Sequence, residues 1–467
     1  MKKVILIAFY FNQVNEIASK RLRALAKYLP QFGWEPIVIV PDLGFIPKEN
    51  DGLNCRIIYT EYEDMFSHFS RKLKMPNSNN NSNNNSNNNS NNNSNFEGND
   101  LKNMEQEDKL KDSDSFSNPL VSKAVSIAGE VFAYPDGMKY WHESAFEEAS
   151  RIIEEEEIDG IISSSWPITC HTIAKDLKER YDIPWIADLR DLWNLNPYVS
   201  HTFIRNYFER RLELKTFENV DVLTTTTDLA SETLASLHPE SRIATILSGY
   251  DEDDLKFLSS IIDERIDDVH HDVEDALKND KLKLIYAGSL YGGKRDPTNL
   301  FKAIRQLEDE GKLDSSKISM EFYGDSTNLE EIAAKYDLLD ILKIGGKISH
   351  EEVLKKQLDS DVLLLISWNS EKEKMFIPGK IYEYFALGKP VLSIGYREGS
   401  LKDLINETKV GCHVSDLEST KEALLKLYDE FLKRGTIELN SEIDIEDYSM
   451  ENMAKKFSDL LNDLYVG

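Results

Sequence analysis

Short apolar runs rich in β-branched residues alternate with amphipathic stretches along most of this chain, and this alternation constrains the fold more than any other feature. Such runs, when bounded by helical stretches, are typical of parallel strands buried on both faces. The pattern extends from "VILIAFY" (4–10) to "RIATILSGY" (242–250) and restarts at "LKLIYAG" (282–288). Ser349 with Glu352 predicts a capping box at one helix start. The sequence therefore predicts an α/β protein with two doubly wound, Rossmann-like sheets in tandem.

The 467-residue length agrees with two domains, because a single core seldom serves so long a chain. We expect an N-terminal domain at 1–247, a C-terminal domain at 248–440, and an amphipathic helix at 441–467 that packs back on the N-terminal domain. Residues 71–118 include a long run of Asn and Ser, are too polar to bury, and predict a disordered insert. Since ligands bind beyond the carboxyl ends of parallel strands, we expect the two domains to face each other across a ligand-binding cleft.

Composition excludes several classes of protein. A formal net charge of −28 argues against nucleic acid as a partner, because phosphate binding needs clustered Lys and Arg. Three widely spaced cysteines without a CxxC motif predict neither a disulfide framework nor a zinc site, and they favour the cytoplasm. No run of about 18 apolar residues predicts a membrane-spanning helix.

The segment "YAGSLYGGKRDP" (286–297) predicts a ligand-binding loop. We expect a strand to end at Gly288 and a glycine-rich turn to follow it. Asp296 and Pro297 are then predicted as the N-cap and the first residue of the next helix. Lys294 and Arg295 bring positive charge to that helix start, which suits a diphosphate. A flexible turn with solvated basic side chains is an equally good interpretation of this loop taken alone.

The same loop matches most of a phosphate-binding Walker A motif through Gly288, Gly293 and Lys294. That motif requires Ser or Thr next, to hold magnesium, and this chain has Arg295. A P-loop NTPase is therefore disfavoured.

A second cationic helix start is predicted in "PGKIYEYFALGKPVL" (378–392). A helix that begins near Gly379 and stops at Gly388 places Lys380 at its amino end, where exposed amides carry partial positive charge. Glu383 lies on the same face and can accept hydrogen bonds from a vicinal diol such as a ribose. A local Lys380–Glu383 ion pair is the alternative. With two basic loops on neighbouring strands, we favour a nucleoside diphosphate as ligand.

These two segments, together with "IPWIADLRDLW" (183–193), resemble family 4 (group 1) glycosyltransferases of the GT-B fold. The stretch "ASKRLRALAKYLPQFGWEPIVIV" (18–40) is similar to the acceptor-side domain of that family. The resemblance implies retaining transfer of a sugar from a nucleotide-sugar donor to a glycan or lipid-linked acceptor. It implies no cofactor and no catalytic metal.

The resemblance also implies roles for individual residues. The residues expected to bind the donor diphosphate are Gly288, Ser289, Lys294, Arg295, Gly379 and Lys380. The ribose is expected to bind Glu383. The candidate catalytic residues are Asp188, Arg190 and Asp191, in the segment where many members carry a catalytic-site histidine. In place of the family's glycine-rich loop after the first strand, the candidate acceptor contacts are Asn12, Asn15 and Ser19.

The chain departs from the family pattern at two informative positions. Met375 stands where the family has the first of two paired glutamates, and Ser289 replaces an arginine. Both changes favour the alternative of a non-catalytic sensor or scaffold, and an epimerase of the same fold is a further alternative. The stretch "RNYFERRLELK" (205–215) is more typical of a helix with a solvated basic face; peripheral contact with anionic lipid at the inner membrane face, or with a lipid-linked acceptor, is the other interpretation.

Overall fold

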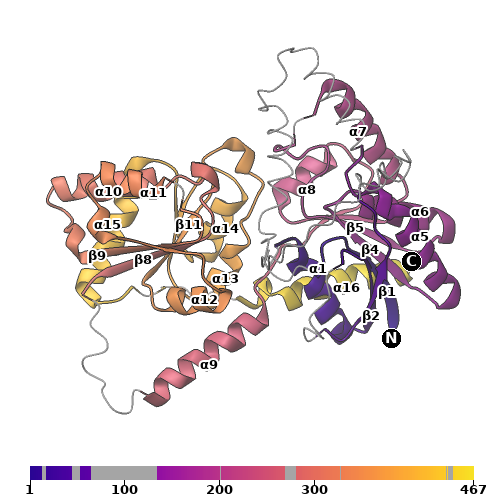
Figure 1. Ribbon diagram of the computed structural model, residues 1–467, viewed down its shortest axis with the longest axis horizontal. Helices are drawn as coiled ribbons and strands as arrows, with labels where there is room; N and C mark the ends of the chain where they lie inside the picture. The colour runs from indigo at the N-terminus through magenta and orange to yellow at the C-terminus, as the bar shows by residue number, and fades with distance from the viewer. Residues whose placement is uncertain are drawn as a thin grey trace, which may run out of the picture. The chain divides into compact units, whose positions relative to one another are not determined.

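The structure, a computed structural model, describes residues 1–12, 17–44, 53–64, 134–199, 201–268, 280–326, 328–437, 439 and 445–466. The chain divides into two compact units, Met1–Leu223 with Leu464–Gly467, and Thr224–Asp463 (Figure 1). The first unit holds most of one sheet and the second holds a separate sheet, called below the N-terminal and C-terminal sheets. The insert predicted at 71–118 and the candidate acceptor residue Asn15 lie outside the described residues.

The described residues of the N-terminal sheet form seven strands in the order β3-β2-β1-β4-β5-β6-β7. β1 pairs in parallel with β2 and with β4, so that Ile5 lies opposite both Ile37 and Ile161. The strands are β1 (Lys2–Ile7), β2 (Trp34–Pro41), β3 (Arg56–Thr60), β4 (Gly160–Ser164), β5 (Trp185–Leu189), β6 (Val222–Thr225) and β7 (Ile243–Thr245). The helices that connect or follow them are α1 (Ile17–Tyr28), α5 (His142–Glu155), α6 (Thr169–Tyr181), α7 (Phe203–Thr216), α8 (Asp228–Ala235) and α9 (Glu252–Asp268).

The C-terminal sheet has six strands in the described residues, in the order β10-β9-β8-β11-β12-β13, and every pair is parallel. The strands are β8 (Leu282–Ala287), β9 (Ile318–Tyr323), β10 (Leu342–Gly346), β11 (Val362–Ile366), β12 (Val391–Ile394) and β13 (Gly411–Val414). The helices are α10 (Thr298–Asp309), α11 (Leu329–Lys335), α12 (His350–Leu358), α13 (Lys380–Leu387), α14 (Ser400–Thr408), α15 (Leu417–Arg434) and α16 (Met450–Val466).

Strand β11 shows why its apolar run has no polar alternation. Leu364 and Ile366 pack into one core cluster, while Leu363 and Leu365 pack into another. Because successive side chains of a strand point to opposite faces, both faces of the sheet are buried under helices. The predicted doubly wound sheet is confirmed.

Two predicted helix boundaries are confirmed and one is wrong by a residue. Ser349 and Glu352 form the predicted capping box of α12, and α13 ends at Gly388 with a φ of 60°. Helix α10 begins at Thr298, so Pro297 takes the N-cap position and Asp296 precedes it. The Asp296 carboxylate nevertheless accepts a hydrogen bond from the Thr298 amide, at 2.8 Å.

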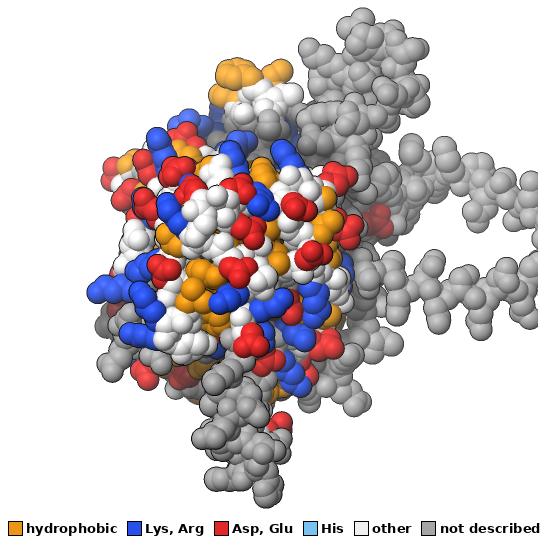
Figure 2. All heavy atoms as spheres, turned by 90° about the vertical axis from the view of Figure 1, so that its left-hand side faces the viewer, with side chains coloured by type: hydrophobic (Ala, Val, Ile, Leu, Met, Phe, Trp, Pro, Cys, Tyr) orange, Lys and Arg blue, Asp and Glu red, His pale blue; other side chains and the backbone are white. Residues whose placement is uncertain are grey.

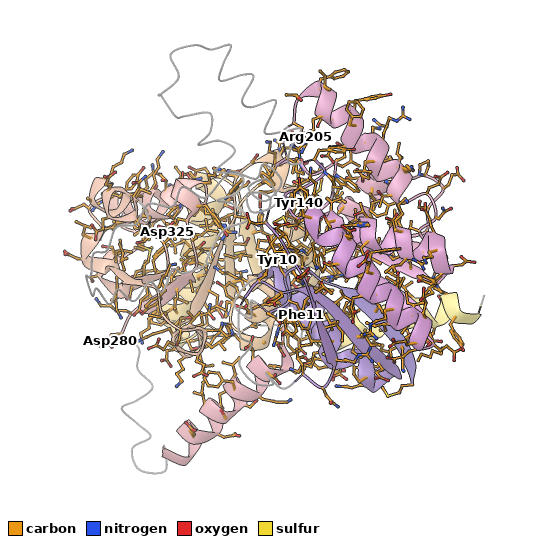
Figure 3. The ribbon with its side chains drawn as sticks, turned by 45° about the vertical axis from the view of Figure 1, so that its right-hand side comes forward. Tyr10, Phe11, Tyr140, Arg205, Asp280 and Asp325 are labelled. Atoms are coloured by element: carbon orange, nitrogen blue, oxygen red, sulfur yellow. The ribbon has the colours of Figure 1, made fainter. Side chains whose placement is uncertain are left out.

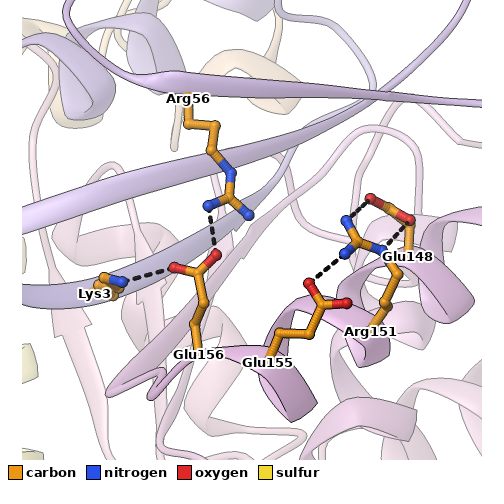
Figure 4. A network of polar contacts seen from close by, with 6 residues as sticks. All are labelled: Lys3, Arg56, Glu148, Arg151, Glu155 and Glu156. Carbon is orange, nitrogen blue, oxygen red and sulfur yellow. Dashed lines mark hydrogen bonds and ion pairs between the residues drawn. The ribbon is translucent and has the colours of Figure 1, made fainter.

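A carboxylate joins three elements of the N-terminal sheet, as Figure 4 shows. Glu156, which follows α5, accepts hydrogen bonds from Lys3 on β1 at 2.6 Å and from Arg56 on β3 at 2.5 Å. These hydrogen bonds lower the pKa of Glu156 to about 2. One turn earlier, Arg151 bridges Glu148 and Glu155 along α5. The Glu156 contacts thus link the edge strand β3, which the sequence pattern did not predict, to β1 across the intervening strand β2.

Candidate functional site

The topology of the C-terminal sheet marks its binding edge. β8 and β11 are neighbours in the middle of the sheet, but the chain leaves β8 toward β9 and leaves β11 toward β12 (Figure 1). The loops that follow these two strands therefore diverge, and in open parallel sheets ligands bind at the carboxyl end between two such strands; this place is called the crevice below. Both basic segments predicted from the sequence come to this place, because one follows β8 and the other follows β11.

The loop after β8 is held in a defined shape by hydrogen bonds. The Gly288 amide donates to the Tyr323 carbonyl at 2.7 Å, and the Ser289 hydroxyl donates to the Asp325 carboxylate (labelled in Figure 3) at 3.1 Å. The turn at Tyr291–Gly293 closes with left-handed glycines, including Gly293 at a φ of 89°. This conformation favours glycine, so the glycines of the segment serve a tight, ordered turn.

Lys380 reaches from the start of α13 to the end of β8. Its ammonium donates a hydrogen bond to the Ala287 carbonyl and lies 5.1 Å from the ring centroid of Tyr286. A Cβ atom on Gly288, whose φ is 153°, would collide with this ammonium. A side chain at position 288 would therefore displace the end of the Lys380 side chain, so these two predicted diphosphate residues lie in contact.

Aromatic side chains hold the other two cations of the crevice. The Lys294 ammonium lies 4.7 Å from the ring centroid of Trp368, which follows β11, and the Trp368 and Tyr291 rings meet edge to face at 6.4 Å. The Arg295 guanidinium lies 4.4 Å from the Tyr291 centroid and donates to the Ser289 carbonyl at 3.4 Å. The buried Nε of Arg295 has no hydrogen-bond partner in the described structure. The electron-rich faces of these rings attract the cations and hold them in place.

The remaining predicted donor residues lie on α13. Gly379 is the N-cap of this helix, and space is open beside its Cα. Glu383 is half-buried, one turn after Lys380. The structure thus brings Gly288, Ser289, Lys294, Arg295, Gly379 and Lys380 together around the ends of β8 and β11, with Glu383 on the adjoining helix. Sequence reasoning missed Trp368 and Tyr291; the position of Trp368 directly after a buried strand was the available signal.

A small cavity lies beside the loop after β11. Its lining includes Ser367, Glu373, Phe376 and His413. His413 donates through Nε2 to the Tyr396 carbonyl at 2.7 Å, so its Nδ1 accepts from the Ser393 hydroxyl at 2.9 Å, and burial lowers the pKa of this imidazole. Glu373, two residues before Met375, is the carboxylate that this loop contributes to the lining of the cavity.

The N-terminal unit has a corresponding edge, at the ends of β4 and β5. Asp188 is fully buried and accepts two hydrogen bonds from Arg21 on α1, at 2.9 and 3.0 Å, and one from the Ser164 hydroxyl at 2.9 Å. Arg190 donates through Nε to the Ser165 carbonyl at 2.6 Å and lies 3.8 Å from the Asp191 carboxylate. Of the three predicted catalytic residues, Asp188 thus lies in the core, while Arg190 and Asp191 lie nearer the surface.

Two of the candidate acceptor residues, Asn12 and Ser19, lie in the part of the chain that the structure describes. Asn12 follows β1 and is half-buried, whereas Ser19 is fully buried on α1. Trp141 and Trp193 are buried packing residues. Arg21, the partner of Asp188, was not singled out from the sequence, because its contact joins residues 167 positions apart.

On the face shown in Figure 2, which is the left-hand side of Figure 1, basic and acidic side chains are interspersed. Among the described residues, no group of three or more His, Cys, Asp and Glu is arranged to hold a metal ion. Over the same part of the chain, none of the helices combines the length and the apolar character needed to cross a bilayer.

Comparisons with known proteins agree with this architecture. Residues 270–463 match the family model for glycosyl transferases group 1. Sucrose-phosphate synthase from Thermosynechococcus elongatus is similar over 100% of both chains, with 14% identity and a TM-score of 0.58. A glycosyltransferase from Rickettsia africae is similar over 99% of this chain and 98% of its own, with 14% identity and a TM-score of 0.58. The Anabaena protein HepE in complex with UDP is similar over 99% and 100%, with 10% identity and a TM-score of 0.55.

A comparison with curated proteins gave no match. At identities of 10–14%, the similarity to solved structures defines the fold and not the activity. The chain has the GT-B fold, built from two Rossmann-like parallel sheets, as its sequence predicts.

Proposed function

We propose that this protein is a retaining glycosyltransferase that moves a sugar from a nucleoside diphosphate sugar to a glycan or lipid-linked acceptor. The observation that carries the proposal is the convergence of Lys294, Arg295 and Lys380 on the crevice between β8 and β11. Three cations and a helix amino end at one switch point suit a diphosphate group. The Anabaena protein of the same fold was also solved with UDP-glucose.

In the proposed complex, the donor diphosphate lies over the turn that follows β8. Lys380 gives up its hydrogen bond to the Ala287 carbonyl and contacts a phosphate, and the ammonium of Lys294 approaches from Trp368. Glu383 accepts hydrogen bonds from the ribose hydroxyls. Glu373 faces the donor sugar in place of the family glutamate that Met375 replaces.

Charge develops on the diphosphate as the bond to the sugar breaks. Cations already in position strengthen their contacts as this charge grows, and such contacts lower the barrier more than they tighten substrate binding. These cations would supply this stabilisation, and the resemblance to the family implies no catalytic metal. Asp188, Arg190 and Asp191, at the corresponding edge of the N-terminal sheet, are the proposed catalytic residues; Asp188 lies in the core, where Arg21 and Ser164 hydrogen bond with its carboxylate.

Binding and turnover are measured separately to test the proposal. The purified full chain is screened by thermal shift and calorimetry against UDP, GDP, ADP and their glucose, N-acetylglucosamine and mannose conjugates, because a ligand that binds only the folded state raises the melting temperature. Nucleotide release and the sugar products are then followed by chromatography. We expect binding of at least one nucleotide sugar, and release of its nucleoside diphosphate together with a transferred or hydrolysed sugar.

Variants connect the activity to the crevice. Lys294→Ala and Lys380→Ala are each expected to lower the transfer rate by about 100-fold or more, with an unchanged melting temperature in the absence of ligand. Lys312→Ala is the matched control, because it removes an exposed lysine at the far end of α10. Near-normal transfer by either site variant would contradict the assignment of the phosphate site. Interconversion of sugars would show an epimerase, and binding without turnover would show a sensor.

A further inference from the structure

Helix α7 presents its large apolar side chains to solvent. Phe203 is 87% exposed, Ile204 69%, and Tyr207 and Phe208 each 53%. Leu214, two turns later, is 41% exposed. Isolated exposed apolar residues are ordinary on a protein surface, but five on one 14-residue helix form a continuous patch. Figure 1 shows α7 at the periphery of its unit.

The opposite side of α7, which faces the protein, is polar. The buried residues of the helix are Arg205, Glu209, Glu213 and Thr216. Glu209 accepts hydrogen bonds from Trp193 at 2.7 Å and from Arg205 (labelled in Figure 3) at 3.3 Å. Glu213 accepts a hydrogen bond from the Asn194 amide at 3.0 Å. Because buried charges need such partners, these contacts fix which side of α7 faces inward. The apolar side cannot turn inward without breaking them.

The exposed charges of α7 all have one sign. Both of its carboxylates are buried, whereas Arg210, Arg211 and Lys215 are exposed. Arg211 also donates a hydrogen bond to the Tyr207 hydroxyl at 3.1 Å, so cation and aromatic ring lie together. At about 100° per residue, the five apolar and three cationic positions fall within an arc of about 160°. This cationic and aromatic face stands on a chain with a formal net charge of −28.

We propose that this face of α7 docks on an anionic lipid bilayer, with its rings at the headgroup level and its cations on lipid phosphates and carboxylates. Aromatic and aliphatic side chains flanked by Arg and Lys are the composition that binds such an interface. A second copy of the chain fits less well, because a symmetric contact would bring the three cations of each copy against one another. The inference rests on α7 alone and is independent of the proposed sugar transfer.

Vesicle co-sedimentation of the full chain tests the inference. Vesicles of phosphatidylcholine with 30% phosphatidylserine are compared with vesicles of phosphatidylcholine alone, at about 0.05 and 0.5 M salt. The protein is expected to sediment with the anionic vesicles at low salt, and to be largely released at high salt because the surface charge is screened. Absence of binding to the anionic vesicles, or equal binding to both kinds, would overturn the inference.

Two sets of variants assign the binding to α7. Arg210→Gln, Arg211→Gln and Lys215→Gln together are expected to weaken binding by about 100-fold, at about five-fold per cation. The control triple is Lys426→Gln, Lys433→Gln and Arg434→Gln on α15, which makes the same change in net charge at exposed positions. Phe208→Ser is expected to weaken binding, whereas Leu432→Ser, at an exposed leucine of α15, is expected to have no effect.

The remaining outcomes also decide between occupants of the face. Circular dichroism and thermal unfolding are expected to be unchanged in all variants, since the altered side chains are exposed. Loss of thermal stability in Phe208→Ser would show that another part of the chain covers the patch. Sedimentation velocity that shows a dimer dissociated by Phe208→Ser would show a self-association surface. Either result, or equal loss of vesicle binding in the α7 and α15 triples, would refute docking of α7 on the bilayer.

Discussion

Removal of Arg21 is the sharpest test of how the N-terminal unit is built. Its guanidinium meets the Asp188 carboxylate with two hydrogen bonds, and the side chains are only 5% and 0% exposed. Arg21→Met keeps much of the aliphatic volume but leaves a carboxylate buried with the Ser164 hydroxyl. Breaking a buried pair in this way costs about 3–5 kcal/mol. For a unit of this size the melting temperature should fall by about 6–20 °C.

A double-mutant cycle separates the pair from its surroundings. Asp188→Asn in the Arg21→Met background removes the stranded charge, so the double variant should be more stable than the sum of the single changes predicts, by at least about 1 kcal/mol. Differential scanning calorimetry is the assay, and the transition of the C-terminal unit serves as an internal reference. Arg305→Met, in an exposed pair with Asp309 on α10, is the external control and should change stability by under about 1 kcal/mol.

The result that would refute this reasoning is additivity. If Arg21→Met costs less than about 1 kcal/mol, or if the two changes add within about 0.5 kcal/mol, the pair is not a buried ion pair. The same variants bear on catalysis. Asp188→Asn with full stability and no transfer would make Asp188 a residue that acts on substrate, whereas parallel losses of stability and activity would make it a positioning residue.

Three further predictions follow from single side chains. Burial lowers the pKa of His171 from 6.5 to about 3, so below pH 6.5 the unfolded chain binds a proton that the folded chain does not. The free energy of unfolding should therefore fall as the pH drops from about 6.5 to about 3, by up to about 1.4 kcal/mol per pH unit. Urea denaturation of His171→Gln should show a flatter dependence of this free energy on pH. Gly288→Ala should strain the turn at its φ of 153° and displace the end of the flexible Lys380 side chain, so transfer should fall, but by less than the loss of about 100-fold expected for Lys380→Ala. Gly137→Ala, which meets open space, should leave transfer unchanged, and normal activity of Gly288→Ala would count against the contact. Ser349→Ala should remove the cap of α12 and cost about 1 kcal/mol in thermal unfolding, and a loss under about 0.2 kcal/mol would count against the capping box.

The central strands were predictable because a strand that is buried on both faces needs consecutive apolar residues, as in β11. Two of the edge strands, β3 and β13, were not predicted. β3 and β13 are only partly buried, and their short segments lack such a run. The acidic connector after residue 250 also contains a helix, α9, that the charge pattern concealed. Edge elements satisfy weaker burial requirements, so their sequences carry a weaker signal.

The candidate donor site was predictable for a topological reason. Parallel strands of one sheet end at the same edge, so loops after β8 and β11 must meet once both strands are placed in that sheet. The sequence could not show which side chains hold the cations in place. Trp368 and Tyr291 reach the crevice from different loops, and their contacts with Lys294 and Arg295 appear only in three dimensions.

The amino-acid sequence alone determined the two sheets, the helix caps and the position of the basic loops. Each of these features depends on residues a few positions apart in the chain, or on whether a single strand is buried. The tertiary structure alone decided which charges are buried. A charged residue is assigned to solvent by default, yet Asp188 lies in the core through Arg21, and Glu209 and Glu213 turn inward on α7 through Trp193 and Asn194. Hydrogen bonds from these partners, which come from other elements of the structure, offset the hydration that the buried carboxylates lose. The same contacts leave the aromatic side of α7 exposed.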